Sequence, residues 1–195
     1  MGFKKESLIE GDFILLREIN LEDAESIFNW RIGVSGQYMN QPDGYCLQMQ
    51  KSWMSNRPEN EINYIIIDKK SNQSVGMVAI VGISEQDKNA EIGRLLLAPE
   101  FLKKSNPYGL EALKLCSNQI LNEWGFHKIY GNVLSENIPM LKLQKYLGMI
   151  EEGLLKDQKK IKGEMYDLHL VALFENNFRT KYIPRISMLL KAFNY

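Results

Sequence analysis

The stretch FLKKSNPYG at residues 101–109 combines side chains and backbone groups that could hold a phosphate. It precedes a predicted helix over residues 110–125, and the start of a helix offers free backbone N–H groups and the positive end of the helix dipole. Both favour a bound phosphate or pyrophosphate. Lys104 could add a charge-assisted contact, whereas Pro107 has no N–H to donate. The alternative is an ordinary turn between a strand and a helix that binds nothing.

Glu91 is the second candidate, because it is a carboxylate inside the apolar run AEIGRLLL at residues 90–97. Burying a carboxylate alone is costly, so Glu91 requires a partner or a cavity. An ion pair with Lys88 or Lys162, or an exposed strand start, is the alternative to a functional role. Alternation along a regular strand predicts one face with Glu91, Gly93, Leu95 and Leu97 and another with Ile92, Arg94 and Leu96.

Both features lie in a predicted succession of strand, loop, helix, strand and short helix. The strands cover residues 90–100 and 127–134, and the short helix covers residues 136–149 and ends at Gly148. Further elements are expected on either side, each from its apolar pattern and turn residues. Upstream these are a strand at 12–18, helices at 21–30 and 47–56, and strands at 61–68 and 74–84.

The predicted upstream helix begins after Asn20, a residue type favoured at helix starts. Its expected apolar stripe contains Leu21, Ala24, Ile27 and Phe28. Downstream, strands at 150–155 and 165–173 are expected to be joined by a charged hairpin loop at 157–164, and residues 177–195 are expected to contain a short amphipathic helix.

The composition limits the classes of function. A chain of 195 residues fits one domain with a proper core. Its 24 basic and 24 acidic residues balance, which argues against a general nucleic-acid binder. Two cysteines and two histidines leave little for a disulfide framework or a metal site, and both histidines are expected to be structural. No apolar run approaches the roughly 20 residues of a membrane span, and no secretory signal is recognisable, so the cytoplasm is the expected compartment.

The loop and the short helix together resemble the GCN5-related N-acetyltransferase (GNAT) family. The cofactor loop of that family has the pattern Arg/Gln-x-x-Gly-x-Gly/Ala. Here it aligns with residues 104–109, where a lysine replaces the Arg/Gln, Pro107 replaces the first glycine, and Gly109 matches. The family also has an asparagine followed by a Leu-Tyr-x-x-x-Gly-Phe-like run, which resembles Asn137 and residues 143–149 here. The resemblance extends more weakly over residues 13–173.

The resemblance implies that acetyl-coenzyme A (acetyl-CoA) lies in a splay between two central strands, with its pyrophosphate at the helix start. The contacts expected for it are Leu95, Leu97, Lys104, Ser105, Asn106, Tyr108, Gly109, Leu110 and Asn137. Asn137 could also cap the short helix, and backbone N–H groups near residues 95–97 would polarise the thioester carbonyl. Glu91 is implied as the general base that takes a proton from the substrate ammonium.

The general acid is where the chain departs from the family. Many GNAT enzymes carry a tyrosine at the position of Gln144, and glutamine has no useful acidic proton. Tyr146 lies about 200° further around the helix and should face elsewhere, while Tyr108 and Tyr130 have no support from position. Gln144 could instead hydrogen-bond the sulfur, because a thiolate is a tolerable leaving group without an acid.

Residues 28–53 are the expected substrate wall. Arg31 could bind a carboxylate or phosphate through two bonds, and Trp30 and Tyr38 could stack on a base or sugar. The alternatives are core packing for Trp30 and a structural ion pair for Arg31. This region is similar to two GNAT branches, one that acetylates ribosomal-protein N-termini and one that acetylates amino groups on nucleotide-linked sugars.

The expected fold is therefore α/β, a single GNAT-like domain with a central mixed, mostly antiparallel sheet of about seven strands flanked by about four helices. Residues 1–176 are expected to form the acyltransferase domain and residues 177–195 a helical extension packed on it. The expected function is direct transfer of an acetyl group from acetyl-CoA to a primary amine, on a peptide or a small molecule, in a ternary complex. Cys116 has no evident base partner for a covalent route.

Two alternatives remain at this stage, an amino-sugar-nucleotide N-acetyltransferase and a degenerate GNAT-like domain that binds a ligand or partner without turnover. No metal, nucleic acid or membrane partner is expected. The chain is expected to be a monomer or a homodimer.

Overall fold

The computed structural model has one central sheet, and the structure describes residues 4–39, 41–102, 105–161 and 163–193. Within this part the strands are β1 Leu8–Glu10, β2 Ile14–Glu18, β3 Ile62–Asp68, β4 Ser74–Ser84, β5 Asn89–Leu97, β6 Lys128–Leu134, β7 Ile150–Ile161 and β8 Glu164–Phe174. Their order across the sheet is β1-β2-β3-β4-β5-β6-β8-β7, and only β5 and β6 run parallel. The predicted α/β fold is confirmed, with eight strands because β1 adds a strand beside β2.

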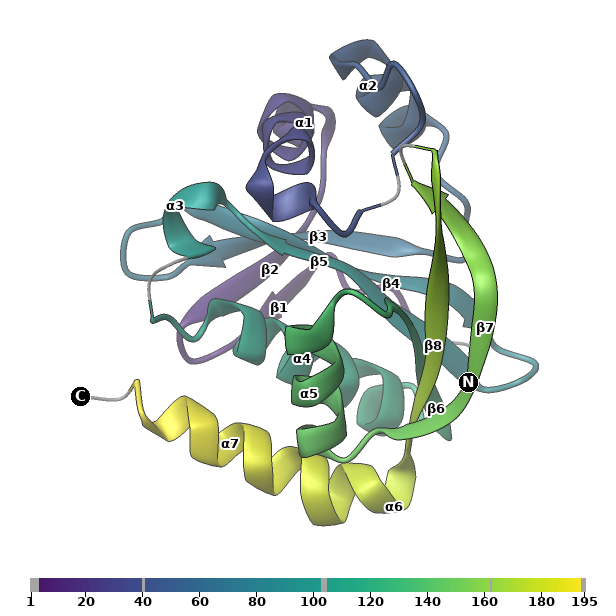
Figure 1. Ribbon diagram of the computed structural model, residues 1–195. Coiled ribbons are helices and arrows are strands. Elements are labelled where there is room, and N and C mark those ends of the chain that lie inside the picture. Colours follow the sequence, from purple (N-terminus) through teal and green to yellow (C-terminus); the bar gives the residue numbers. More distant parts are fainter. Residues whose placement is uncertain (1–3, 40, 103–104, 162, 194–195) are drawn as a thin grey trace.

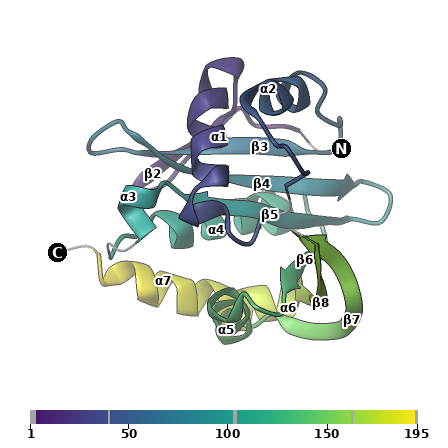
Figure 2. The same cartoon turned by 45° about the horizontal axis from the view of Figure 1, so that its top comes forward.

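Helices cover both faces of the sheet (Figures 1 and 2). The first half of the chain contributes η1 Leu21–Asp23, α1 Ala24–Ile32, η2 Val34–Gly36 and α2 Leu47–Ser55, with α1 and α2 on one face. The later helices are α3 Pro99–Leu102, α4 Tyr108–Asn118, η3 Gln119–Glu123, α5 Ile138–Leu147, α6 Glu175–Asn177, η4 Phe178–Tyr182 and α7 Ile183–Lys191. Of these, α4, α5 and α7 lie on the opposite face. Two buried hydrophobic clusters result, one beneath each layer.

The strands β5 and β6 separate soon after they meet. They pair only from Asn89 to Glu91 on β5 and from Lys128 to Tyr130 on β6. Although β5 continues to Leu97 and β6 to Leu134, the described residues beyond these points do not pair with each other. The β5 edge that faces β6 is therefore open from Ile92 onward, which is the splay implied by the GNAT resemblance.

A bulge at Arg94 reverses the faces of β5. Arg94 has φ 52°, and the register with β4 shifts between Met77 and Ala79. An extra residue in one strand moves all later side chains to the other face. The predicted alternation is therefore wrong beyond Gly93, because Leu95 and Leu97 pack with Ile92 on the α4 side, and Leu96 packs against Trp30 on the α1 side.

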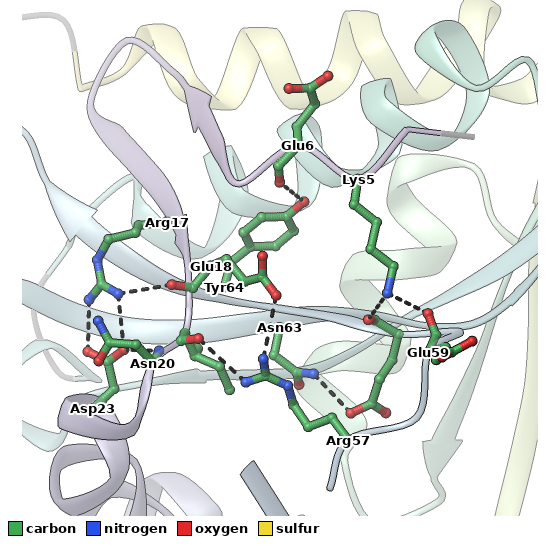
Figure 3. A network of polar contacts seen from close by, with 12 residues as sticks. Lys5, Glu6, Arg17, Glu18, Asn20, Asp23, Arg57, Glu59, Asn63 and Tyr64 are labelled. Carbon is green, nitrogen blue, oxygen red and sulfur yellow. Dashed lines mark hydrogen bonds and ion pairs between the residues drawn. The ribbon is translucent and has the colours of Figure 1, made fainter. Parts of the chain in front are cut away.

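The start of α1 is held by polar contacts beside β2 and β3 (Figure 3). Arg17 donates to both carboxylate oxygens of Asp23, at 3.1 and 2.8 Å, and the Asn20 side chain caps η1. The predicted helix is confirmed, but its buried stripe is Ala24, Ile27 and Trp30. Leu21 is 57% exposed because it lies in the preceding 3₁₀ turn, outside the α-helical period.

The helix α4 is fastened to the start of β2 by a buried carboxylate. Glu111 is 1% exposed and accepts backbone N–H bonds from Asp12 at 2.7 Å, Phe13 at 2.8 Å and Ile14 at 2.9 Å. Hydrogen bonds to a buried charge are among the stronger ones in proteins. This contact fixes the helix whose first turn faces the splay.

The charged segment predicted as a loop at 157–164 is mostly strand. β7 runs to Ile161, and Lys159, Lys160 and Ile161 pair with the first residues of β8. The Asp167 carboxylate accepts the backbone N–H of Asp157 at 3.0 Å and the Lys156 ammonium at 2.6 Å. Pairing with β8 therefore keeps this polar segment in a strand.

The C-terminal helices pack into the main core. Phe178, Tyr182, Ile186 and Leu190 are each less than 5% exposed, and the Tyr182 hydroxyl accepts from Ser117 at 3.0 Å. The predicted amphipathic helix is confirmed, with Met188 on its exposed side. In the described residues, no helix is both long and apolar enough to span a membrane.

Candidate active site

The splay between β5 and β6 contains a cavity of about 200 Å³. β5, β6, α5 and the loop after α1 contribute its walls. Its polar lining includes Tyr38, Glu91, Arg94, Asn132, Asn137 and Gln144, and its apolar lining includes Ile92, Leu95 and Met140. The structure thus brings together five of the predicted site residues, namely Tyr38, Glu91, Leu95, Asn137 and Gln144. Leu97 lies outside this lining and packs in the main core.

Glu91 faces this cavity at the point where the strands part. Its Oε2 accepts from Asn132 Nδ2 at 2.8 Å. Burial raises the pKa of Glu91 above its usual value, and the hydrogen bond from Asn132 opposes that change. Among the described residues Glu91 forms no ion pair, and Lys88 lies over the Phe126 ring instead. Lys162, the other predicted partner, lies outside the described residues. The raised pKa makes this carboxylate a stronger base than a free one, which suits a proton acceptor.

α5 brings two amide side chains to the opposite wall of the cavity. Asn137 is the N-cap residue of α5 and its Oδ1 accepts from the Met140 N–H at 3.4 Å. The predicted capping role is therefore present, and the same side chain also lines the cavity. Gln144 Oε1 is buried and has no hydrogen-bond partner among the described residues. Such an atom is unfavourable unless a ligand or water meets it.

The loop before α4 leads to Gly109, which lies near Leu95 of β5, and Leu95 lines the Glu91 cavity. The Asn106 side chain organises the turn, because Nδ2 donates to the Phe101 carbonyl at 2.8 Å and Oδ1 accepts from the Tyr108 N–H at 3.2 Å. A side chain added at Gly109 would meet only Leu95, at 3.9 Å, so there is open space in front of the helix start. Ser105 is exposed and Leu110 is half-buried. The predicted contact Lys104 lies outside the described residues.

Family comparison identifies the class of the protein. The family description "Acetyltransferase (GNAT) domain" matches residues 14–150, which is most of the chain. The chain belongs to the GNAT acetyltransferase family. This GNAT chain is an N-acetyltransferase, and its splay and its loop before α4 are the features that the resemblance in sequence had implied.

Individual relatives agree with this assignment. The uncharacterized N-acetyltransferase p20 of Bacillus licheniformis is 26% identical over 179 residues, covering 85% of this chain and 94% of the relative. A GNAT structure from Brucella melitensis superposes with a TM-score of 0.80 at 17% identity, over 95% of this chain and 86% of that one. The spermidine N-acetyltransferase of Vibrio cholerae in complex with CoA and spermine gives 0.74 at 20% identity, over 89% and 99%.

Tyr146 and Tyr108 lie outside the cavities that Gln144 lines, whereas Tyr38 lines the Glu91 cavity with Gln144, and Tyr130 and Tyr182 line a smaller cavity with it. Tyr146 is 43% exposed beneath Arg185, as its position around the helix predicted. Tyr108 packs on the Phe101 ring, and Tyr130 lies beside Gly82, whose added Cβ would come 2.3 Å from the hydroxyl oxygen. Cys116 is fully buried, which raises the pKa of its thiol to about 12 and argues against a nucleophilic role.

The predicted substrate residues divide into two groups. Trp30 is 7% exposed in the core beneath α1, so its assignment to substrate contact is corrected to core packing. Tyr38 lines the Glu91 cavity. Arg31 lies over the Tyr45 ring, 5.1 Å from its centroid, and Arg94 lies over the Trp53 ring at the same distance.

Sequence reasoning missed Asn132 and Arg94. Asn132 lies two residues beyond Tyr130, which is opposite Glu91 in the parallel register, so an amide inside the apolar strand was a usable signal. Arg94 had no such signal, because its position depends on the bulge. Within the described residues, no three His, Cys, Asp or Glu side chains cluster closely enough to hold a metal ion.

Proposed function

We propose that this enzyme transfers an acetyl group from acetyl-CoA to a primary amine, on a peptide or a small molecule, by direct attack in a ternary complex. The observation that carries the proposal is Glu91, a half-buried carboxylate with a raised pKa in the splay between β5 and β6. An amine must lose a proton before it can attack a carbonyl carbon. Glu91 accepts that proton, either directly or through water, and Asn132 orients the carboxylate.

The chain's own groups fit acetyl-CoA. When bound, it supplies an acyl group activated as a thioester. The start of α4 at Gly109 and Leu110 would hold the pyrophosphate with backbone N–H groups, together with Ser105, Asn106 and Lys104, while the Tyr108 N–H stays bonded to the Asn106 side chain. The open space at Gly109 and its contact with Leu95 support this assignment, because the helix start and the Glu91 cavity share a wall.

The remaining groups would act on the thioester. The open edge of β5 near Leu95 and Leu97 offers N–H groups that would stabilise charge on the carbonyl oxygen. Asn137 would align the pantetheine arm. Gln144 would donate a hydrogen bond to the departing sulfur, because glutamine has no acidic proton to give. The new N–C bond replaces the C–S bond, the nitrogen loses its second proton to solvent as the amide forms, and the thiolate takes a proton from solvent.

The two alternative functions require different features of the site. An amino-sugar-nucleotide acceptor would use the same base and cofactor site, with its phosphates beside Arg31. A GNAT domain that binds without turnover would leave Glu91 unused. The half-buried, unpaired state of Glu91 within the described residues favours turnover, because an idle carboxylate gains nothing from this position.

Substitution of Glu91 tests the proposal. Purified protein is incubated with acetyl-CoA and a panel of primary amines, and acetylated product is measured by mass spectrometry. We expect Glu91→Gln to lower kcat by about 10²–10⁴-fold, with little change in Tm, while Glu136→Gln, at an exposed carboxylate outside the cavity, keeps the kcat of the unaltered chain. Unchanged turnover in Glu91→Gln would remove the proposed base.

A further inference from the structure

A second cavity lies beside the one that contains Glu91, between the end of α1, α2 and β5. Its volume is about 420 Å³, and its lining includes Arg31, Met39, Tyr45, Gln50, Trp53 and Arg94. Met39 and Arg94 line both cavities, so the two are direct neighbours. The proposed acetyl transfer leaves this second cavity without a role.

The charge of the second cavity is positive. Its described lining contains two guanidinium groups and no carboxylate. Arg94 bonds Glu61 Oε2 and Asn63 Oδ1, each at 2.9 Å, and so forms a neutral pair with Glu61. The pKa of Arg31 is lowered, first by burial and also by Arg94, whereas Tyr45 raises it. A partly buried guanidinium such as that of Arg31 is stabilised by a bound anion.

The groups around Arg31 hold it in one position. Its guanidinium lies over the Tyr45 ring, and its backbone carbonyl accepts from the Gln41 side chain. Gly36 packs so closely that an added Cβ would lie 1.8 Å from that carbonyl oxygen. These contacts fix the backbone of Arg31 and place its guanidinium against an aromatic ring, and a guanidinium can present its planar fork to two oxygens of a carboxylate or phosphate.

Gln50 supplies a further donor to the same cavity. It is 1% exposed, and the Tyr45 hydroxyl donates to its Oε1. Its buried Nε2 has no hydrogen-bond partner among the described residues. Leaving a buried donor without a partner is unfavourable, and an anionic oxygen in the cavity would accept from it.

We propose that this cavity binds an anionic group of the acceptor, so that the acceptor is an amine that also carries a carboxylate or phosphate. The inference rests on the proposed acetyl transfer, because the amine end of the acceptor is the end that reaches Glu91. Arg31 and Gln50 bind the anion, and Tyr45 and Trp53 line the space around it. A polyamine such as the spermine of the Vibrio cholerae complex would instead bring a second ammonium group toward Arg31, where like charges repel.

Matched acceptors of one skeleton test this inference. The probes are γ-aminobutyrate, aminopropyl phosphate, butylamine and putrescine, each with a shorter and a longer homologue. For each probe, kcat/KM is measured with acetyl-CoA, and binding to the complex of protein and CoA is measured by calorimetry. The variants are Arg31→Gln, Arg31→Lys in case the first fails to fold, and Arg57→Gln as control. Arg57 contacts Glu18 and the Ile19 carbonyl, outside this cavity.

We expect the best anionic amine to exceed butylamine by about tenfold or more in kcat/KM, as an ion-assisted hydrogen bond implies. Putrescine should be poorest. The better of the two anionic probes identifies carboxylate or phosphate as the preferred group. Arg31→Gln should abolish the preference, Arg31→Lys should keep part of it, and Arg57→Gln should keep all of it.

Other outcomes separate this inference from the proposed function. Equal or better use of butylamine or putrescine would overturn the anionic acceptor and leave acetyl transfer intact. Binding of an anionic probe that depends on Arg31, without acetylation of any amine, would support the anion site and overturn the transfer. If no anionic probe binds and no amine is acetylated, both the anion site and the proposed acetyl transfer are overturned.

Discussion

Glu91 combines three properties that a general base requires. It faces a cavity, it has an orienting donor in Asn132, and burial raises its pKa above the usual value. In the proposed mechanism Gln144, on the opposite wall, would supply a hydrogen bond and no proton. The proposed chemistry is therefore asymmetric, with a protein base on one side and a thiolate that would leave without a protein acid on the other.

The pH dependence of kcat follows from the direction of the Glu91 pKa shift. A base acts only when ionised, so kcat should fall as the pH falls through the raised pKa, with a midpoint above 4.5. Because the Asn132 hydrogen bond lowers that pKa, Asn132→Leu should move the acidic limb to higher pH. The measurement is kcat against pH in both proteins. An acidic limb that is identical in the two would argue against Glu91 as the titrating group.

At the scale of elements, the site depends on one bulge and one splay. The bulge at Arg94 aims Leu95 at the start of α4 and Arg94 at α2, and the early separation of β5 from β6 opens the cavity between them. A non-glycine residue with positive φ costs about 1–3 kcal/mol and persists where its surroundings enforce it. Glu61 and Asn63, which hold the Arg94 guanidinium, supply that constraint.

The buried Glu111 carboxylate gives a stability prediction for α4. The backbone N–H groups of Asp12, Phe13 and Ile14, at the start of β2, all donate to the Glu111 carboxylate. Glu111→Gln should lower the free energy of unfolding by about 2 kcal/mol and Glu111→Ala by about 3 kcal/mol or more, because buried donors lose their acceptor. Chemical denaturation measures this, with Glu123→Gln, exposed on the following η3 turn, as the matched control. Equal stability of Glu111→Ala and the unaltered chain would contradict this role.

Most of the helices and strands were predictable from sequence, whereas the bulge in β5 and the full length of β7 were not. The succession from β5 through α4 and β6 to α5 follows from apolar pattern and turn residues, and it brings Glu91 and Asn137 together. The bulge left no local signal, since arginine is not a residue that favours positive φ. The second half of β7 is polar and becomes strand only through its partners in β8. Gln50 and Tyr45 join the site through tertiary packing, from far along the chain.

At the scale of the whole molecule, both ends of the chain contribute to one structure. The Trp124 indole donates to the backbone of Lys4 at 3.0 Å, and Phe178, Tyr182 and Ile186 lie in the same cluster as Ile14 of β2. The division into a domain at 1–176 and an extension at 177–195 remains a prediction from sequence.

Truncation after Asn176 tests that division. It would remove four side chains that are less than 5% exposed, Phe178, Tyr182, Ile186 and Leu190. At about 1.5–3 kcal/mol each, their burial is comparable with the about 5–15 kcal/mol that stabilises a whole domain. We therefore expect the truncated chain to lose cooperative thermal unfolding, as followed by circular dichroism. A truncated chain with the Tm of the full chain would show that the segment is a separable extension.

Calorimetric titration of the full chain with acetyl-CoA and with free CoA tests whether the splay is an acetyl-CoA site. We expect micromolar binding of both. We also expect Gly109→Asp to weaken that binding by at least about tenfold, since a carboxylate at the start of α4 would repel the pyrophosphate, whereas folding persists because a side chain there has room. Absence of binding by the folded, unaltered chain would contradict the assignment of this splay as an acetyl-CoA site.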